Sequence, residues 1–242
     1  MIFSHSDKKN ALLGVLFIVA IPVFLITLNV TWMVNDIRFY ENGFEDNNIS
    51  SVTGIEDGDL MEVSREIRNY FNSLNEPLGV RTKIFGEEHE LFNQREIIHM
   101  RDVKRLIWGV YIFGSIAGLY LIGNTGGGFY TIGSGFGPIL CLRIIKGAVF
   151  TIGFVTIIGI SALTGFQKLF KLFHQISFPN DYWILNPSTD FLLMMFPQEF
   201  WLHSTLFLGI MVMVQSLVLG SIAGAALFAI RSNRRPWIKG GS

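Results

Sequence analysis

The stretch "ALLGVLFIVAIPVFLITLNVTWMV", residues 11–34, contains no charged side chain. A helix needs roughly 20 apolar residues to cross the ~30 Å hydrocarbon core of a bilayer, and this stretch is long enough. Lys8 and Lys9 precede it, as in a signal peptide, but the run is too long for one and no small-x-small cleavage site follows. The stretch therefore predicts a membrane-spanning helix.

Three further apolar segments meet the same requirement. They cover residues 106–123, 144–166 and 204–230, and charged side chains are almost confined to their ends, as the cost of burying a charge in hydrocarbon demands. Half of the residues are apolar and 22 are phenylalanine, which is a membrane composition. We predict an all-α membrane protein with four transmembrane helices, forming a single integral domain over residues 1–242.

Basic residues near the predicted spans set the orientation, because the cytoplasmic side retains lysine and arginine. In a four-span arrangement one face receives a group of eight basic residues: Lys8, Lys9, Arg143, Lys146, Arg231, Arg234, Arg235 and Lys239. We expect both termini to be cytosolic. Residues 35–104 then form an extracellular loop domain and residues 167–203 an outer-leaflet interfacial loop.

The first of these two outer regions is polar, with fifteen acidic residues against eight basic ones. Its stretch "LMEVSREIRNYF", residues 60–71, has apolar residues at helical spacing, which is typical of a helix that covers a small core. An acidic outer domain gives no reason to expect a nucleic-acid partner.

The second outer region is apolar, rich in aromatic residues and interrupted by Pro179, Pro187 and Pro197. Tryptophan and tyrosine favour the headgroup level, so we expect this region to lie in the membrane interface. Polar groups at such a depth are costly unless they have partners, which makes them functional candidates. Those present are His174, Asn180, Asp181, Tyr182, Asn186, Asp190 and, at the end, His203.

A second histidine belongs to the same membrane face. His99 lies in "FNQREIIHMRDVKRLI", residues 92–107, just before the predicted span at 106–123. A neutral imidazole can accept or donate a proton near neutral pH. We therefore treat His99 and His174 as a candidate pair for proton transfer.

Glycine-rich stretches carry structural expectations. Residues 123–138, "GNTGGGFYTIGSGFGP", lack the Lys-Ser/Thr of a phosphate loop and predict a flexible cytosolic turn. The spacings Gly114/Gly118 and Gly220/Gly224 are typical of close helix contacts within the bundle. Cys141 is the only cysteine, which excludes a disulfide within the chain.

Two segments of the chain resemble those of a known protein family. "LFNQREIIHMRDVKRL" and "FHQISFPNDYWILNPSTDFLLMMFPQEFW", on a four-span frame with an acidic first outer loop, resemble the DUF1461 family, whose characterised members are the lipoprotein intramolecular transacylases, Lit. The likeness extends over nearly the whole chain. It rests on a His-Met-x-Asp-Val motif and an Asn-Asp-Tyr-Trp motif that occur in the right order on the right loops.

The resemblance implies a reaction and a place for it. Members of this family move the sn-2 fatty acyl chain of a bacterial lipoprotein's S-diacylglyceryl group to the α-amino group of the same N-terminal cysteine, which gives a lyso-form lipoprotein. The family's catalytic histidines map onto His99 and His174. The partners would be a diacylated lipoprotein and membrane lipid, at the outer leaflet of a bacterial cell membrane. The oligomeric state is not implied.

The chemistry assigns further roles by residue type. Donor and acceptor belong to one substrate and an amide is more stable than an ester, so we expect no cofactor and no metal. Asp102 or Asp190 could orient an imidazole, and Asn180, Tyr182 or Asn186 could stabilise an oxyanion. Two other classes stay open: a metal-dependent membrane hydrolase using His89, His99, His174 or His203, although no HExxH motif is present, and a non-catalytic adaptor with an acidic outer domain.

Overall fold

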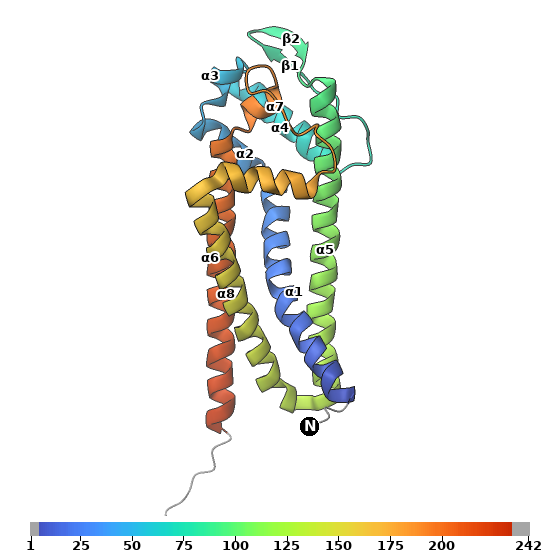
Figure 1. The fold of residues 1–242 in the computed structure, drawn as a ribbon, viewed down its shortest axis with the longest axis vertical. Helices are drawn as coiled ribbons and strands as arrows, with labels where there is room; N and C mark the ends of the chain where they lie inside the picture. The colour runs from blue at the N-terminus through green and yellow to red at the C-terminus, as the bar shows by residue number, and fades with distance from the viewer. Residues whose placement is uncertain (1–4, 234–242) are drawn as a thin grey trace, which may run out of the picture. The chain divides into compact units, whose positions relative to one another are not determined.

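The computed structural model describes residues 5–233, which are mostly helical (Figure 1). The order of elements is α1 (His5–Asn35), α2 (Ile37–Asp46), α3 (Ile49–Thr53), α4 (Asp57–Phe71), β1 (Arg81–Ile84), β2 (Glu87–Glu90), α5 (Gln94–Ile132), a 3-10 turn η1 (Gly133–Gly135), α6 (Phe136–Ser177), α7 (Phe191–Met195) and α8 (Gln198–Asn233).

Three helical runs are long and apolar enough to cross a membrane: Asn10–Asn35, Gln94–Ser177 and Gln198–Asn233. The second run comprises α5, η1 and α6. The four predicted spans therefore lie in α1, α5, α6 and α8, one in each helix.

Residues 123–138, the glycine-rich stretch, were predicted to form a flexible turn. This prediction is wrong for most of the stretch, which is helical. Helix α5 continues to Ile132 and α6 begins at Phe136, so that only Gly133–Gly135 separate them. Glycine lowers helix stability by about 1 kcal/mol per residue without forbidding the helix. The reversal needs glycine at Gly133, whose φ is 65°. A Cβ at Gly128 would lie 2.3 Å from the Phe136 ring, so this glycine leaves room for that ring.

The chain divides into two compact units. The first unit comprises the described parts of Met1–Leu28, Phe113–Ile158 and Gly209–Ser242; the second unit comprises Asn29–Ile112 and Gly159–Leu208.

Glycines allow close helix approach in the first unit. A Cβ at Gly118 would lie 2.9 Å from the Phe24 ring of α1, and one at Gly220 would lie 3.2 Å from Cβ of Ala148 on α6. A Cβ at Gly224 would have no neighbour within 4 Å. A Cβ at Gly114 would lie 2.7 Å from the Thr27 hydroxyl of α1. The predicted contacts within the bundle are therefore confirmed at Gly114, Gly118 and Gly220 and wrong at Gly224.

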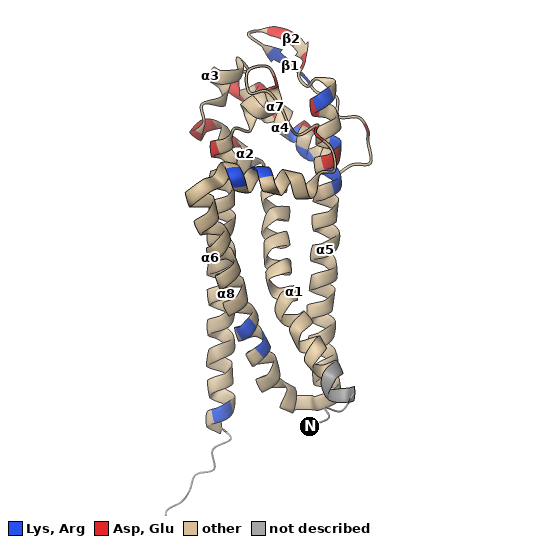
Figure 2. Cartoon of the chain, in the orientation of Figure 1, with Lys and Arg blue, Asp and Glu red and all other residues tan. Residues whose placement is uncertain are grey.

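The second unit has a core of the kind found in water-soluble domains. Helix α4 buries one face, as its periodicity predicts: Leu60, Val63 and Ile67 are each no more than 2 % exposed. They pack in one cluster with the aromatic side chains of α2 and with Met195 of α7. Strands β1 and β2 form an antiparallel hairpin in which Arg81 pairs with Glu90. Figure 2 shows acidic positions, coloured red, on several of these elements of the second unit.

Helix α6 changes direction within the second unit. Gly165 has a non-helical backbone (φ −172°, ψ 53°), and Figure 1 shows the helix bending there before it ends at Ser177. The region predicted as one interfacial loop thus begins with a helix, and an irregular connector occupies only residues 178–190.

Some of the basic residues that predict the orientation lie outside the described part of the chain. The structure describes Arg143, Lys146 and Arg231. Outside the described residues or side chains lie Lys8, Lys9, Arg234, Arg235 and Lys239.

Candidate functional site

His99 is positioned by the first turns of α5. The Asn93 side chain accepts hydrogen bonds from the backbone N–H groups of Arg95 (2.9 Å) and Glu96 (3.2 Å), and Glu96 Oε2 accepts one from the backbone N–H of Asn93 (2.8 Å). This reciprocal arrangement is a capping box, which fixes where the helix starts. His99 lies one turn further on and is 6 % exposed.

His174 is positioned by the part of α6 that follows Gly165. Its Nδ1 lies 2.8 Å from the backbone oxygen of Phe170, one turn earlier. A carbonyl oxygen only accepts, so Nδ1 carries the proton in this bond and Nε2 has a free lone pair. The ring is 7 % exposed and packs against the rings of Phe170 (4.3 Å between centroids) and Trp183 (5.1 Å).

The two imidazoles lie close together in an aromatic pocket. Their ring centroids are 6.0 Å apart, and Phe178 contacts both, with its ring edge-on to His99 at 5.1 Å. Nδ1 of His99 is buried and forms no hydrogen bond with any described residue. A buried nitrogen of this kind costs stability until a partner reaches it.

The surroundings favour neutral imidazoles. Both rings lie outside the predicted spans at 106–123 and 144–166. Burial lowers the pKa of His99, the neighbouring His174 lowers it further, and Asp102 acts in the opposite direction. Burial also lowers the pKa of His174, against the hydrogen bond to Phe170. Each ring can therefore accept a proton at neutral pH.

Asp102, a predicted orienting carboxylate, ties the connector to α5. Its Oδ2 accepts a hydrogen bond from Nδ2 of Asn180 (2.8 Å), and its Oδ1 accepts one from Arg105 (3.3 Å). Asn180 in turn accepts a hydrogen bond from the backbone N–H of Tyr182 (3.1 Å). Asp102 thus holds the connector beside the helix that carries His99 and forms no hydrogen bond with an imidazole of the described residues.

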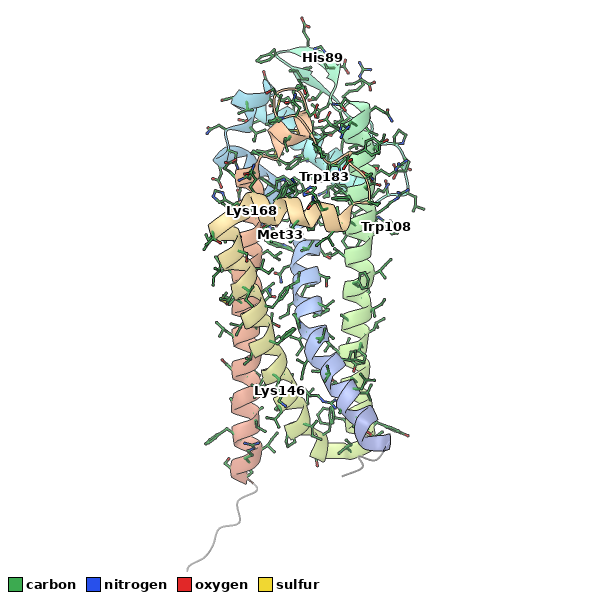
Figure 3. All side chains as sticks on the ribbon, viewed as in Figure 1. Met33, His89, Trp108, Lys146, Lys168 and Trp183 are labelled. Carbon is green, nitrogen blue, oxygen red and sulfur yellow. The ribbon has the colours of Figure 1, made fainter. Side chains whose placement is uncertain are left out.

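Arg95 holds the next part of the connector. Its Nε donates to the backbone oxygen of Ile184 (3.0 Å), its Nη2 donates to the backbone oxygen of Asp181, and its guanidinium lies over the Tyr182 ring at 5.7 Å. The held segment includes Trp183, which packs against His174 (Figure 3 labels Trp183). Arg95 therefore fixes one wall of the histidine pocket.

Asp190, the other predicted orienting carboxylate, also has structural partners. It accepts hydrogen bonds from Nδ2 of Asn93 (3.1 Å), from the Thr189 hydroxyl (3.0 Å) and from the backbone N–H of Asn186 (2.8 Å). Beside it, Oε1 of Glu96 accepts a hydrogen bond from the backbone N–H of Leu192 (2.7 Å). The start of α5 and the start of α7 are joined through these carboxylates.

His203 lies in a different place. It is exposed on α8 and lines a cavity of about 480 Å³ with Trp32, Asp36 and Phe207, among others. Neither His99 nor His174 lines this cavity. The sequence-predicted candidates therefore divide into the histidine pair, the connector residues that support it, and His203 apart from both.

Several supporting residues were not predicted from the sequence. Asn93 and Glu96 follow the Asn-x-x-Glu spacing of a capping box, a signal that was present and could have been used. Phe170 lies one turn before His174 in the same helix, a spacing that the sequence also contains. Arg95, Phe178 and Trp183 act through contacts with residues outside their own helical turn, for which no local pattern exists. Among the residues that the structure describes, no group of three or more histidine, cysteine, aspartate or glutamate side chains is placed to hold a metal ion.

Comparison with known sequences gives two findings. The family model described as "Lipoprotein intramolecular transacylase Lit" matches residues 15–201. A protein of Aquifex aeolicus (strain VF5), described as uncharacterized, is 31 % identical over 124 residues, which cover 50 % of this chain and 50 % of that protein. The chain thus spans about half the length of this curated relative.

Solved structures share the fold. The membrane integral lipoprotein intramolecular transacylase Lit from Bacillus cereus superimposes with a TM-score of 0.78 at 18 % identity, over 93 % of this chain and 99 % of that one. A variant of the same protein, with a histidine replaced by arginine, gives 0.74 at 17 % identity over 95 % and 96 % of the two chains. Because the family model matches most of the sequence, including both histidine-bearing segments, the chain belongs to the lipoprotein intramolecular transacylase family.

Proposed function

We propose that this chain catalyses the intramolecular acyl transfer from which its family takes its name, at the His99–His174 pair. The sn-2 acyl chain of a lipoprotein's S-diacylglyceryl cysteine would move to the α-amino group of the same cysteine. The observation that carries the proposal is the pair of buried imidazoles with ring centroids 6.0 Å apart, in an otherwise aromatic pocket.

The reaction needs one proton removed and one returned. The amine attacks the ester carbonyl carbon, the C–N bond forms, and the C–O bond to glycerol breaks as the tetrahedral intermediate collapses. The amine must lose a proton, and the glycerol oxygen must gain one as it leaves. Atoms balance without water or a co-reactant, and the product is the N-acyl, lyso-glyceryl cysteine.

His174 is the better placed of the two histidines to carry this proton. Its Nδ1–H is held by the Phe170 carbonyl, which leaves Nε2 as the base. The unsatisfied Nδ1 of His99 would find its partner in the bound substrate, either the amine or the glycerol oxygen.

The aromatic surroundings favour an apolar substrate part and a neutral base. Phe170, Phe178 and Trp183 would make apolar contacts with the acyl chain of the substrate and keep water from the reacting ester. Among the predicted oxyanion donors, Nδ2 of Asn180 already donates to Asp102. The side-chain oxygen of Asn186 accepts a hydrogen bond from the backbone N–H of Ser188, which leaves its Nδ2 as a donor. Neither this donor nor the Tyr182 hydroxyl forms a hydrogen bond with a described residue, which favours Tyr182 and Asn186 over Asn180 for this role.

The proposal includes a topology. Helices α1, α5, α6 and α8 would each span the membrane, with both termini cytosolic and the histidine pair at the outer leaflet, where residues 35–104 and 167–203 would lie. The distribution of basic residues supports this orientation. The site would then meet the membrane-anchored end of a lipoprotein.

Mass spectrometry of the substrate tests the proposal. A diacylglyceryl lipoprotein is incubated with the purified protein or with its His99→Ala/His174→Ala variant, and the N-terminal peptide is fragmented. We expect an N-acyl, lyso-glyceryl cysteine of unchanged total mass from the unmodified protein alone. Acyl chains that stay on glycerol in both samples would contradict the proposal and favour an adaptor role, whereas loss of one acyl mass would indicate a hydrolase.

A further inference from the structure

The part of α6 after Gly165 has three distinct faces. At 100° per residue, one face contains Phe166, Phe170 and His174, which point into the second unit. The two other faces are exposed or partly exposed. The polar face consists of Gln167, Lys168, Lys171 and Gln175, and the apolar face consists of Leu169, Leu172, Phe173 and Ile176.

The apolar face is large for a short helix. Leu172 is 51 % exposed, Phe173 47 % and Ile176 77 %. Side chains of this kind on consecutive turns make a continuous apolar strip, which is uncommon on a surface that faces water.

The polar face next to it carries two lysines without acidic partners. Neither Lys168 nor Lys171 forms a salt bridge or hydrogen bond with any residue in the described range 5–233. Figure 2 shows both as basic positions on this stretch of α6, and Figure 3 labels Lys168 there. Two ammonium groups therefore border the apolar strip.

The direction of this stretch fits a helix that lies in the plane of a membrane. Figure 1 shows it running crosswise to the beginning of α8, with which it packs through Phe170 and Trp201. A helix with one apolar and one basic face, parallel to the surface, is the arrangement of an interfacial helix, and its basic side chains attract anionic lipids.

We propose that residues 166–177 bind anionic phospholipid headgroups in the outer leaflet. Lys168 and Lys171 contact the headgroup phosphates, while Leu172 and Ile176 enter the acyl region. Because His174 lies on the third face of the same helix, this contact sets the depth at which His174 meets the substrate ester. The proposal deepens the function proposed above, and only its effect on activity rests on that function.

Lipid retention tests the contact without any need for activity. The protein is purified from bilayers of phosphatidylcholine mixed with phosphatidylglycerol, and the lipids that stay bound are counted by native mass spectrometry. A lysine near an anionic surface contributes about 1 kcal/mol to lipid binding. We therefore expect the affinity of K168Q/K171Q for phosphatidylglycerol to be lower than that of the unmodified protein by about tenfold or more. The matched control R65Q/K83Q removes two exposed basic groups elsewhere in the second unit and should retain lipid normally.

Equal retention of phosphatidylglycerol by K168Q/K171Q and the unmodified protein would overturn the proposal. The proposal would also be overturned if R65Q/K83Q lost as much phosphatidylglycerol as K168Q/K171Q, because the loss would then depend only on total charge.

The activity arm uses the same variants in bilayers with and without phosphatidylglycerol. We expect the unmodified protein to form product faster in the mixed bilayer, with a gain that decreases at high salt, and K168Q/K171Q to lose this gain while keeping its rate in phosphatidylcholine. A gain that persists in K168Q/K171Q would contradict the link to His174. Absence of product from every protein, with the expected lipid retention, would instead remove the proposed reaction and leave the lipid contact standing.

Discussion

The two compact units bury different kinds of side chain. In the second unit, Glu96, His99, Lys104, His174 and Asp190 are all less than 9 % exposed. In the first unit, the buried polar side chains among the described residues are Thr151 and Ser216, and neither titrates in the ordinary pH range. Each of these two hydroxyls is satisfied within its own helix, by the carbonyl four residues earlier.

Under the proposed function, this difference separates anchoring in the first unit from chemistry in the second. Helices that face lipid need no buried charge, since small residues and local hydrogen bonds are sufficient for packing. A buried titratable group needs a network, and the second unit supplies one. The buried Lys104, for example, donates a hydrogen bond to the Asn75 carbonyl, pairs with Glu76 and lies 4.0 Å from the centre of the Tyr70 ring. Substitutions in the second unit should therefore affect activity as well as stability, whereas substitutions in the first unit should affect packing.

The largest effect is expected at the histidine pair. His99→Ala or His174→Ala should each lower the rate of acyl transfer about 10²- to 10⁴-fold, because one removes the nitrogen proposed to hold the reacting amine or glycerol oxygen and the other removes the base. Initial rates measured by mass spectrometry would show this. His89→Ala and His203→Ala are the matched controls, since both residues are exposed and lie outside the pocket, and full activity in His99→Ala or His174→Ala would end the corresponding assignment.

The next effect is expected on stability of the second unit. In Glu96→Gln, one of the two backbone N–H groups of Asn93 and Leu192 would lose its acceptor, because an amide offers only one oxygen. The free energy of unfolding should fall by about 1–3 kcal/mol. Thermal unfolding in detergent measures the change. Glu88→Gln on the exposed hairpin should leave the midpoint unmoved, and an equal drop there would weaken the argument.

A packing change should affect the first unit by a similar amount. In Gly118→Leu, the new side chain would enter the space of the Phe24 ring, because even its Cβ would lie 2.9 Å from that ring. Overpacking of this kind costs about 1–3 kcal/mol. Gly123→Leu is the control on the same helix, since a Cβ there meets nothing within 4 Å. Equal stability of the two variants, measured by thermal unfolding, would count against the close α1–α5 contact.

The smallest effect is expected at a wall of the pocket. Trp183→Ala should lower the rate about tenfold through a less well-positioned His174, and Trp183→Phe should restore much of it. A pH profile separates this from a purely structural effect. The pKa of His174 is lowered by burial, so the imidazole stays neutral until the pH falls below its usual range. Without Trp183 the ring is more hydrated, its pKa rises, and the acid loss of activity should begin at higher pH.

That profile has a second component which must be subtracted. The substrate amine, with a pKa of about 8, already makes the rate rise with pH below that value. The histidine appears as a further steepening at lower pH, and only this break should move in Trp183→Ala. An unchanged break would mean that Trp183 does not control the environment of His174.

The sequence predicted the broad arrangement because that arrangement follows from periodicity and length. Apolar runs long enough to cross a membrane predicted the helices, and the spacing of Leu60, Val63 and Ile67 predicted the buried face of α4. Glycine content was a poor guide at 123–138, because helix propensity is a weak preference and only Gly133 has a backbone conformation that favours glycine.

The supporting residues of the site could not be predicted in the same way. Arg95 binds carbonyl groups 86 and 89 positions away, and such contacts depend on where the connector lies after folding. Asp102 and Asp190 were assigned to the histidines by residue type. In the structure, Asp102 accepts a hydrogen bond from the Asn180 side chain, and Asp190 accepts one from the backbone N–H of Asn186. Residue type alone does not distinguish a carboxylate that touches an imidazole from one that holds a loop.

The hydrogen bond from Nδ1 of His174 to the Phe170 carbonyl limits the route of the transferred proton. A relay would bring the proton in at one ring nitrogen and release it at the other, but here one nitrogen is already committed to the backbone. Under the proposed mechanism, Nε2 has to take the proton from the amine and hand the same proton to the glycerol oxygen. Both substrate atoms must then come within reach of a single nitrogen, so the migrating acyl group passes through a compact cyclic array, and a glyceryl ester too far from the amine to close that ring would be left untouched.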